Sequence, residues 1–212
     1  MNLSNLLATF ASAFNQDNRL ISLQLGDGAQ LKSHRGEQLL PQSVTGREGV
    51  NQAYCYQLEC LSPDGHIELK SLLGLPVVIG IADANGAEIE RCGVVSQAQL
   101  LGSDGGFAKY GLKIEPPFAL LRHRRTSRVF QDISVPDILK QILTEHQAAN
   151  SVFASVQMLD FKLSGQHPPR SYCLQYRESD FDFIVRLLHE EGLAWRFEHG
   201  AARAAGQSSS AN

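Results

Sequence analysis

The alternation of apolar and polar positions is clearest between residues 170 and 199, where the apolar repeat changes from two residues to a helical spacing and back to two. A repeat of two is typical of a strand with one buried face, and a helical repeat is typical of an amphipathic helix. The segment therefore predicts a strand, a helix and a second strand with almost no linker. On the first strand Tyr172, Leu174 and Tyr176 alternate with Cys173 and Gln175, on the helix Phe181, Ile184, Leu187 and Leu188 share one face, and on the second strand Leu193, Trp195 and Phe197 alternate with Ala194, Arg196 and Glu198.

The ends of this helix carry recognisable capping residues. We expect Ser179 to be the N-cap, with Asp182 at the capping-box position and Asp180 adding negative charge at the positive end of the helix dipole. Gly192 is expected to take the left-handed conformation that ends a helix. Residues two apart on a helix point in different directions, so Asp180 and Asp182 are not expected to share a proton or a metal ion, and capping accounts for both.

The segment 21–116 consists of short apolar runs separated by the turn motifs GDG, PDG, ANG and SDGG. This pattern predicts an antiparallel β-barrel-like domain. In its clearest strand, Ala108, Tyr110, Leu112 and Ile114 face one side, while Lys109, Lys113 and Glu115 face the other, solvated side.

Pro116 and Pro117 interrupt the strand ladder and mark an expected boundary, after which a mixed α+β domain spans 117–199. A helix is predicted from about Val135 to His146. The expected fold class is α+β, mainly β. The helix begins after Ser134, with Pro136 and Asp137 in its first turn and Ile138, Leu139 and Ile142 on its buried face, and Leu159, Phe161 and Leu163 suggest a further strand.

The two ends of the chain differ from these domains. Residues 1–20 predict an amphipathic helix, and because no lysine or arginine precedes Arg19 they do not form a standard signal peptide. No apolar run is long enough for a membrane span. Residues 200–212 are small and polar, which predicts a disordered tail. The apolar positions of the N-terminal helix are Leu3, Leu6, Leu7, Phe10 and Phe14.

Composition and charge narrow the class of protein. A chain of 212 residues with a net charge of -3 can bury a core, and its charge argues against a protein that mainly binds nucleic acid. Its four cysteines have neither the spacing of a zinc site nor the density of a disulfide framework, so reduced thiols are expected.

Motifs for enzyme chemistry are missing from the sequence. It contains no HExxH, GxSxG or Walker A motif, so no catalytic residue, metal ligand or cofactor is predicted. The enzymatic alternative is a hydrolase that uses His189 with the nearby carboxylates of Glu190 and Glu191.

Arginines gather between Arg122 and Arg128, beside the expected domain boundary. A nucleic-acid-binding module is one interpretation, but no aromatic residues interleave with the arginines. A solvated or ion-paired loop is favoured, with salt bridges between subunits as a further hypothesis for Arg122, Arg124, Arg125 and Arg128.

An ordered series of segments resembles the VgrG family, the spike proteins of type VI secretion systems, whose N-terminal part is similar to the baseplate hub of contractile-tailed phages. The segments are VTGREGVNQAYCYQLECLSPD, IELKSLLGLPVVI, YGLKIEPPFALLRHRRTSRVFQDISVPDIL and YCLQYRESDFDF. Together with the strand that ends in FEH they span about residues 19–199, so the resemblance covers most of the chain.

The resemblance implies a structural part of a spike rather than an enzyme. In the family three chains form a collar that sits on a tube of Hcp-type rings, with needle, tip or effector proteins downstream, no nucleic acid and no membrane span. Assembly is implied in the bacterial cytoplasm, and release through the type VI apparatus is left open. The domain 117–199 is expected to be incomplete relative to the family, so trimerisation by this chain alone is also left open.

The signature residues of the resemblance have structural interpretations. Gly46 to Gly49 are expected to form a turn, and Arg177 and Glu178 are expected to form a local or cross-chain ion pair. The full set is Gly46, Arg47, Glu48, Gly49, Phe130, Gln131, Asp132, Tyr172, Tyr176, Arg177, Glu178, Ser179, Asp180, Phe183, Leu187, Leu188, Glu191, Gly192 and Phe197.

Overall fold

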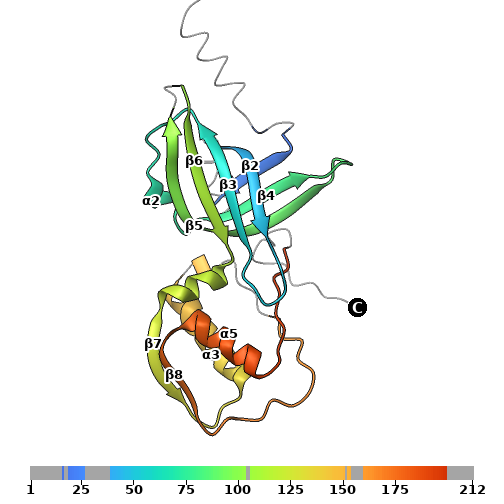
Figure 1. Ribbon diagram of the computed structural model, residues 1–212, viewed down its shortest axis with the longest axis vertical. Coiled ribbons are helices and arrows are strands. Elements are labelled where there is room, and N and C mark those ends of the chain that lie inside the picture. The colour runs from blue at the N-terminus through green and yellow to red at the C-terminus, as the bar shows by residue number, and fades with distance from the viewer. Residues whose placement is uncertain are drawn as a thin grey trace, which may run out of the picture. The chain divides into compact units, whose positions relative to one another are not determined.

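The computed structural model describes residues 16, 19–26, 39–103, 106–150, 152–153 and 160–199. The tail 200–212 and nearly all of the expected helix within 1–20 lie outside these residues. The described residues fall into two compact units, one drawn from 16–47, 55–114 and 199 and the other from 48–54 and 115–198 (Figure 1). The elements are β1 (Ile21–Leu25), β2 (Leu40–Arg47), β3 (Cys55–Ser62), α2 (Leu69–Leu72), β4 (Pro76–Ala82), β5 (Glu88–Ser103), β6 (Ala108–Glu115), the 3-10 helix η2 (Pro117–His123), β7 (Arg125–Phe130), α3 (Val135–Ala149), β8 (Cys173–Ser179) and α5 (Asp180–Glu190).

A six-stranded sheet in the order β1-β4-β5-β6-β3-β2 forms the first unit. The pairs β1–β4, β4–β5, β3–β6 and β2–β3 are antiparallel. The outer strands β1 and β2 lie against each other without being ladder neighbours, so the sheet curls into a half-barrel, which confirms the predicted fold. Its buried face carries Leu23, Leu25, Leu58, Val77, Ile79, Val95, Tyr110, Leu112 and Ile114.

Strand β6 has the bounds that the sequence predicts, and its four alternating apolar side chains are buried. The prediction is wrong for Glu115, which is only 7% exposed. The reason is tertiary, because Arg122 lies 3.0 Å from Oε1 of Glu115 and pairs with its charge.

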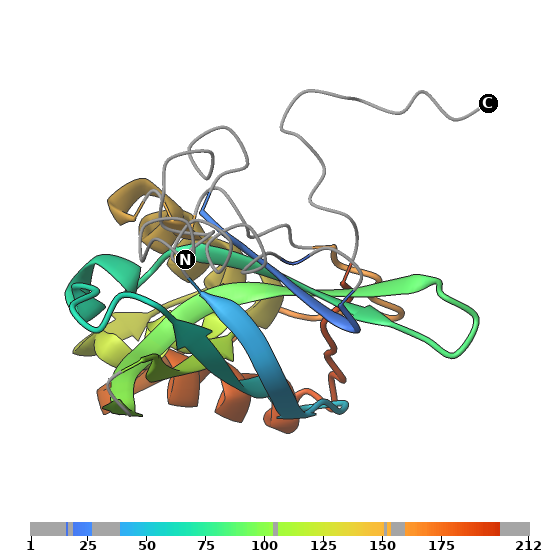
Figure 2. The same ribbon diagram turned by 90° about the horizontal axis from the view of Figure 1, so that it is seen from above.

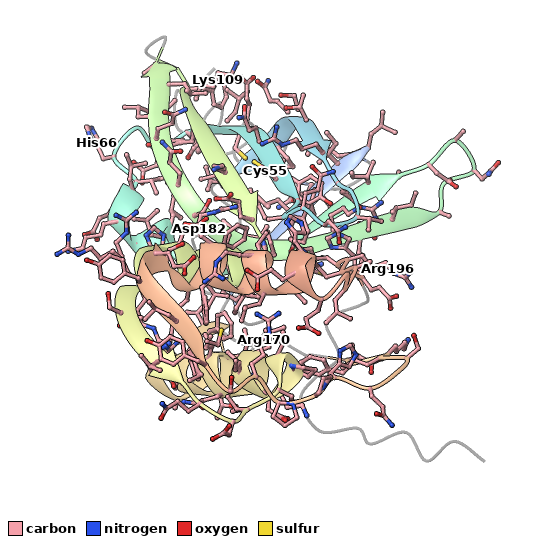
Figure 3. The ribbon with its side chains drawn as sticks, turned by 60° about the horizontal axis from the view of Figure 1, so that its bottom comes forward. Cys55, His66, Lys109, Arg170, Asp182 and Arg196 are labelled. Atoms are coloured by element: carbon pink, nitrogen blue, oxygen red, sulfur yellow. The ribbon has the colours of Figure 1, made fainter. Side chains whose placement is uncertain are left out.

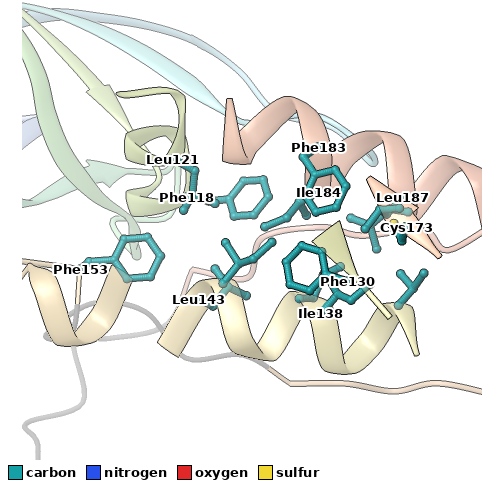
Figure 4. Close-up of a cluster of buried hydrophobic side chains, with 14 residues drawn as sticks. Phe118, Leu121, Phe130, Ile138, Leu143, Phe153, Cys173, Phe183, Ile184 and Leu187 are labelled. Atoms are coloured by element: carbon teal, nitrogen blue, oxygen red, sulfur yellow. The ribbon is translucent and has the colours of Figure 1, made fainter. Parts of the chain in front are cut away.

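The second unit packs α3, α5 and η2 against the two-stranded ribbon β7–β8. Figure 4 shows Ile138 and Leu143 of α3 facing Phe183 and Ile184 of α5. The ring of Phe130 on β7 stacks on that of Phe183, with centroids 5.7 Å apart. Full burial of one such side chain contributes about 1.5–3 kcal/mol, so this cluster holds the unit together.

Both predicted N-caps are confirmed. The hydroxyl of Ser134 accepts from the N–H of Asp137 at 3.4 Å, and that of Ser179 accepts from the N–H of Asp182 at 3.1 Å. Each helix therefore begins where its sequence signal predicts. Helix α3 ends at Ala149, later than the sequence pattern indicates.

The C-terminal end of α5 is also as predicted. Gly192 has φ 65, its N–H donates to the carbonyl of His189 at 3.2 Å, and the N–H of Leu193 donates to the carbonyl of Leu188 at 2.8 Å. This pair of bonds is the Schellman arrangement, which satisfies carbonyls left unpaired at the end of the helix.

The second strand predicted after α5 is not present, although its alternation of buried and exposed side chains is. Leu193, Trp195 and Phe197 are half-buried and pack against the core, while the residues between them are exposed. The backbone of Trp195 bonds both to the N–H and to the side-chain oxygen of Asn51, at 2.8 and 2.9 Å. Asn51 provides both of these hydrogen bonds, and a single partner residue is not enough for residues 193–197 to form a strand ladder.

Strand β8 is confirmed, and the structure decides which of its faces is buried. Cys173 and Gln175 point into the unit, whereas Tyr172, just before the strand, and Leu174 and Tyr176 within it are exposed. No strand includes Phe161 or Leu163, and Leu159 lies outside the described residues.

Truncation of the core should separate the buried from the exposed positions around α5. We predict that Leu188→Ala and Trp195→Ala each lower the free energy of unfolding of the second unit by about 2–4 kcal/mol, because each leaves a cavity. The matched control Arg196→Ala should change it by about 0.5 kcal/mol or less, since Arg196 is exposed and pairs with Glu198. Urea unfolding checks this, and a costly Arg196→Ala beside a neutral Trp195→Ala would contradict the packing described above.

Candidate functional site

A buried carboxylate lies at the centre of the second unit. Asp180, the first residue of α5, has a fully buried side chain. Its carboxylate accepts from Nε of Arg124, from Nη2 of Arg128 at 3.4 Å, from Nε2 of Gln175 at 2.8 Å and from Nε2 of His146 at 2.7 Å. Arg128 lies on β7, Gln175 on β8 and His146 on α3, and Arg124 lies between η2 and β7. The carboxylate of Asp180, on α5, therefore joins the main elements of the unit.

A second carboxylate balances the charge. Oε2 of Glu145 on α3 lies 2.7 Å from Nη2 of Arg124 and 2.7 Å from Nη1 of Arg128. Two carboxylates thus face two guanidinium groups. We call Arg124, Arg128, Glu145, His146, Gln175 and Asp180 the charge cluster.

The hydrogen bonds of the charge cluster determine the ionisation of Asp180. Burial alone raises the pKa of this carboxyl, but hydrogen bonds from His146, Gln175 and Arg124 outweigh it and lower the pKa to about 2. For Glu145 burial also raises the pKa, and bonds from Arg128 and Arg124 bring it below its ordinary value. Both groups are therefore anionic at neutral pH.

This cluster corrects the interpretation of Asp180 as a capping residue. Capping describes Asp182, which receives the hydroxyl of Ser179, but Asp180 points into the core and meets partners up to 56 residues away in sequence. Glu145, His146 and Gln175 were not predicted as partners of Asp180. A weak signal was present, since Gln175 has the alternation of a buried strand position and yet is polar.

The arginines between Arg122 and Arg128 are correspondingly not a loop. Arg124 caps η2 and Arg125 and Arg128 lie on β7. Arg122 pairs with Glu115 and lies 4.2 Å from the centroid of the Phe181 ring. Arg122, Arg124 and Arg128 thus have partners within their own chain, and salt bridges between subunits stay a hypothesis for them.

The carboxylates named in the hydrolase hypothesis are also held in ion pairs. Nη1 of Arg170 lies 2.5 Å from Glu190 and its Nη2 lies 2.5 Å from Glu191, near the end of α5 (Figure 3 labels Arg170). Hydrogen bonds from Arg170 lower the pKa of both carboxyls, which makes them poor proton carriers near neutral pH. His189 is exposed beside them. Among the described residues no group of three His, Cys, Asp or Glu side chains could hold a metal ion.

Arg177 and Glu178 do not pair with each other within the chain, and the cross-chain ion pair stays a prediction. Glu178 accepts from Nη2 of Arg186 at 2.7 Å. Arg177 has φ 50, and its N–H donates to the hydroxyl of Ser127 at 3.0 Å across a bulge between β7 and β8. Its guanidinium lies 5.4 Å from the ring centroid of Tyr176.

The exposed side of the β7–β8 ribbon is apolar. Val129 and Leu174 are register partners, 47% and 40% exposed, and Tyr172 and Tyr176 flank them at 58% and 63%. We call these four residues the ribbon outer face. Isolated exposed apolar residues are ordinary, whereas large contiguous apolar patches are typical of interaction sites.

The other signature residues have structural positions. Gly46 and Arg47 end β2 and are followed by Glu48 and Gly49, so the segment is a strand end rather than a simple turn. A Cβ on Gly46 would lie 2.2 Å from the ring of Tyr56, which explains the glycine. Phe130, Phe183, Leu187 and Leu188 are buried, Gln131 and Asp132 are exposed after β7 with Asp132 at φ 52, and Glu191 pairs with Arg170.

The four cysteines all lie within the described residues. All four cysteines are free, as expected, and burial raises the pKa of Cys60 to about 12. In the part of the chain that the structure describes, no helix has both the length and the apolar character needed to cross a bilayer.

The charge cluster should make the stability of the second unit depend on pH and on Asp180. We predict that Asp180→Asn costs about 3–5 kcal/mol at pH 7, because Arg124 and Arg128 lose one of their two carboxylates. The carboxyl has a folded pKa of about 2, below its unfolded value, so its contribution is complete above about pH 4 and is lost as the pH falls towards 2. The stability difference between wild type and Asp180→Asn, measured by denaturation, should shrink over that interval. A difference independent of pH would contradict an ionised Asp180.

Comparison with known proteins identifies a family and individual relatives that this chain resembles. The model of the phage tail baseplate hub (GPD) family matches residues 47–207. The type VI secretion system spike protein VgrG1b of Pseudomonas aeruginosa is 32% identical over 90% of this chain and 24% of its own length. VgrG1a of the same organism is 34% identical over 78% of this chain and 24% of its own length. The chain therefore spans about a quarter of these relatives.

A solved structure agrees with the sequence relatives. A component of the type VI secretion system of E. coli, with structural similarity to the T4 bacteriophage tail proteins gp27 and gp5, superposes with a TM-score of 0.68 at 27% identity. The match covers 84% of this chain and 45% of that one, and so includes residues of both units. The chain belongs to the phage tail baseplate hub family, among the VgrG spike proteins of type VI secretion systems.

Proposed function

We propose that this chain is the N-terminal hub part of a type VI spike, which associates with copies of itself and docks on the end of a tube of Hcp-type rings. The observation that carries the proposal is the family match over residues 47–207, which includes strands of the half-barrel and the whole described second unit. In this role the chain adapts the symmetry of the spike to that of the tube and transmits force. Assembly takes place in the bacterial cytoplasm, and needle, tip or effector proteins join downstream.

The packing of the second unit supports a mechanical role. The charge cluster joins its helices to the ribbon, and a chain of ion pairs runs from Glu178 through Arg186, Glu190 and Arg170 to Glu191 along α5. Such networks are geometrically specific and resist relative movement of the elements they join. A part that transmits force needs this stiffness, whereas it does not need a catalytic group.

Neither alternative has a specific observation in its favour. The carboxylates beside His189 are held by arginine, and three of the four clustered arginines are paired with carboxylates within the chain. A reproducible hydrolytic activity lost in His189→Ala, with folding unchanged, would restore the enzymatic alternative.

Binding to the tube is the direct test. We predict that the chain binds isolated Hcp-type rings with a micromolar or tighter Kd, measured by pull-down and by biolayer interferometry. It should show no salt-dependent binding to a duplex oligonucleotide, because arginines engaged with carboxylates cannot neutralise phosphates. Duplex binding that weakens steeply with salt, together with no ring binding at about 100 µM, would replace the proposal with a nucleic-acid function.

A further inference from the structure

The ribbon outer face is exposed because of the charge cluster. Gln175 must point inward to donate to Asp180, and the period of two in a strand then places Leu174 and Tyr176 outward. A shift of one residue would bury both side chains but remove Gln175 from the cluster. The exposed tyrosines are therefore fixed by the fold, and they form a surface without a partner among the described residues.

One end of this face is cationic. Arg125 is exposed at the start of β7, and Arg177 is exposed at the bulge, next to Tyr176. The bond from its N–H to Ser127 holds Arg177 at this end. The carboxylate that follows, Glu178, is already paired with Arg186, so it does not cancel these charges. A partner that binds the ribbon outer face should therefore be acidic at one end and have a flat surface that covers the tyrosine rings.

An acidic surface of suitable shape exists on the same chain, at the β4–β5 hairpin. Figures 1 and 2 both show this hairpin extending beyond the rest of its sheet. The paired hairpin, residues 76–94, contains three carboxylates, Asp83, Glu88 and Glu90, and one arginine, Arg91, which the period of two places on the face opposite Glu88 and Glu90. Asp83 shapes the turn, since its Oδ1 accepts from the N–H groups of Asn85 and Ala87, both at 2.8 Å.

Because Asp83 is engaged in the turn, the negative charge that the hairpin presents comes from Glu88 and Glu90. Glu88 and Glu90 are two apart on β5 and so share a face. In the register Glu90 is opposite Gly80, and the preceding Ile79 is fully buried, so the glutamate face points away from the core. Glu88 also accepts from the hydroxyl of Ser22 at 2.6 Å, which orders it. At the tip, Ala84, Gly86 and Ala87 are exposed and small enough to lie flat on tyrosine rings.

We propose that the ribbon outer face of one copy receives the β4–β5 hairpin of a second copy, with Arg125 and Arg177 facing Glu88 and Glu90. The proposal rests on the self-association in the proposed function and names its surfaces. The two surfaces differ, so the contact is heterologous, and such contacts close into rings when the rotation between copies allows. A face two strands wide, about 10 Å, matches the width of a hairpin.

The charges and the rings have different tasks in this contact. Exposed ion pairs contribute little affinity but select orientation, because like charges facing each other are strongly disfavoured. The buried apolar area supplies the affinity. The face is smaller than the roughly 800 Å² per partner of a standard stable interface, so association of this chain alone is weak.

Charge reversal in trans is the test. Sedimentation equilibrium on the full chain from about 10 to 500 µM should show reversible association of wild type. Arg125→Glu with Arg177→Glu, and separately Glu88→Lys with Glu90→Lys, should each weaken it by about tenfold or more, since like charges then face each other. An equimolar mixture of the two double variants should associate again as a hetero-complex. Tyr176→Ala should weaken association without changing its dependence on salt.

Two controls match the charge changes. Glu68→Lys and Arg196→Glu reverse exposed charges outside the two surfaces and should leave association unchanged. Circular dichroism confirms that every variant is folded. A wild type that stays monomeric throughout, double variants that associate like wild type, or a mixture that stays monomeric would each overturn the proposal. Ring binding is measured on the same preparations, so normal association without ring binding refutes the docking function and leaves the surface assignment in place.

Discussion

The burial of one carboxylate, that of Asp180, is the constraint on which the second unit depends. A buried ionised carboxyl is tolerated only when donors surround it, and here four side chains, from β7, β8, α3 and the residue between η2 and β7, provide them. That requirement places β7 beside β8, orients α3 and sets the register of the ribbon. Replacement of buried ion pairs by apolar residues often stabilises a protein, so we interpret the cluster as a source of geometric specificity more than of net stability.

The exposed apolar face follows from the same constraint. With Gln175 and Arg128 committed to the interior, the tyrosines on the other side of the ribbon have no place in the core of their own unit. A protein that acts alone would be expected to carry polar residues there. An assembly component would use such a surface for contacts between chains, as proposed for the ribbon outer face.

The two units hold their elements together in different ways. The first unit curls one antiparallel sheet until its outer strands meet, and the second unit joins short helices to a ribbon through charge pairs. Trp195 adds a contact by bonding to Asn51, a residue from the loop between β2 and β3. The second unit is therefore built from two separate stretches of the chain, 48–54 and 115–198. A division of the sequence at Pro116 misses this, because it assigns residues 48–54 to the first unit.

The sequence by itself determined the features that depend on neighbouring residues. The caps Ser134 and Ser179, the left-handed Gly192 and the alternation in β6 are local signals, and the structure confirms each. Only the tertiary structure decided which face of β8 is buried, that Glu115 is paired, and that residues 193–197 form no ladder. Those outcomes depend on partners distant in sequence, such as Arg124 and Asp180, 56 residues apart. The hydrophobic periodicity of one segment does not predict such a partner. The free energy of a buried charge depends on the charged and polar groups that the tertiary fold places beside it.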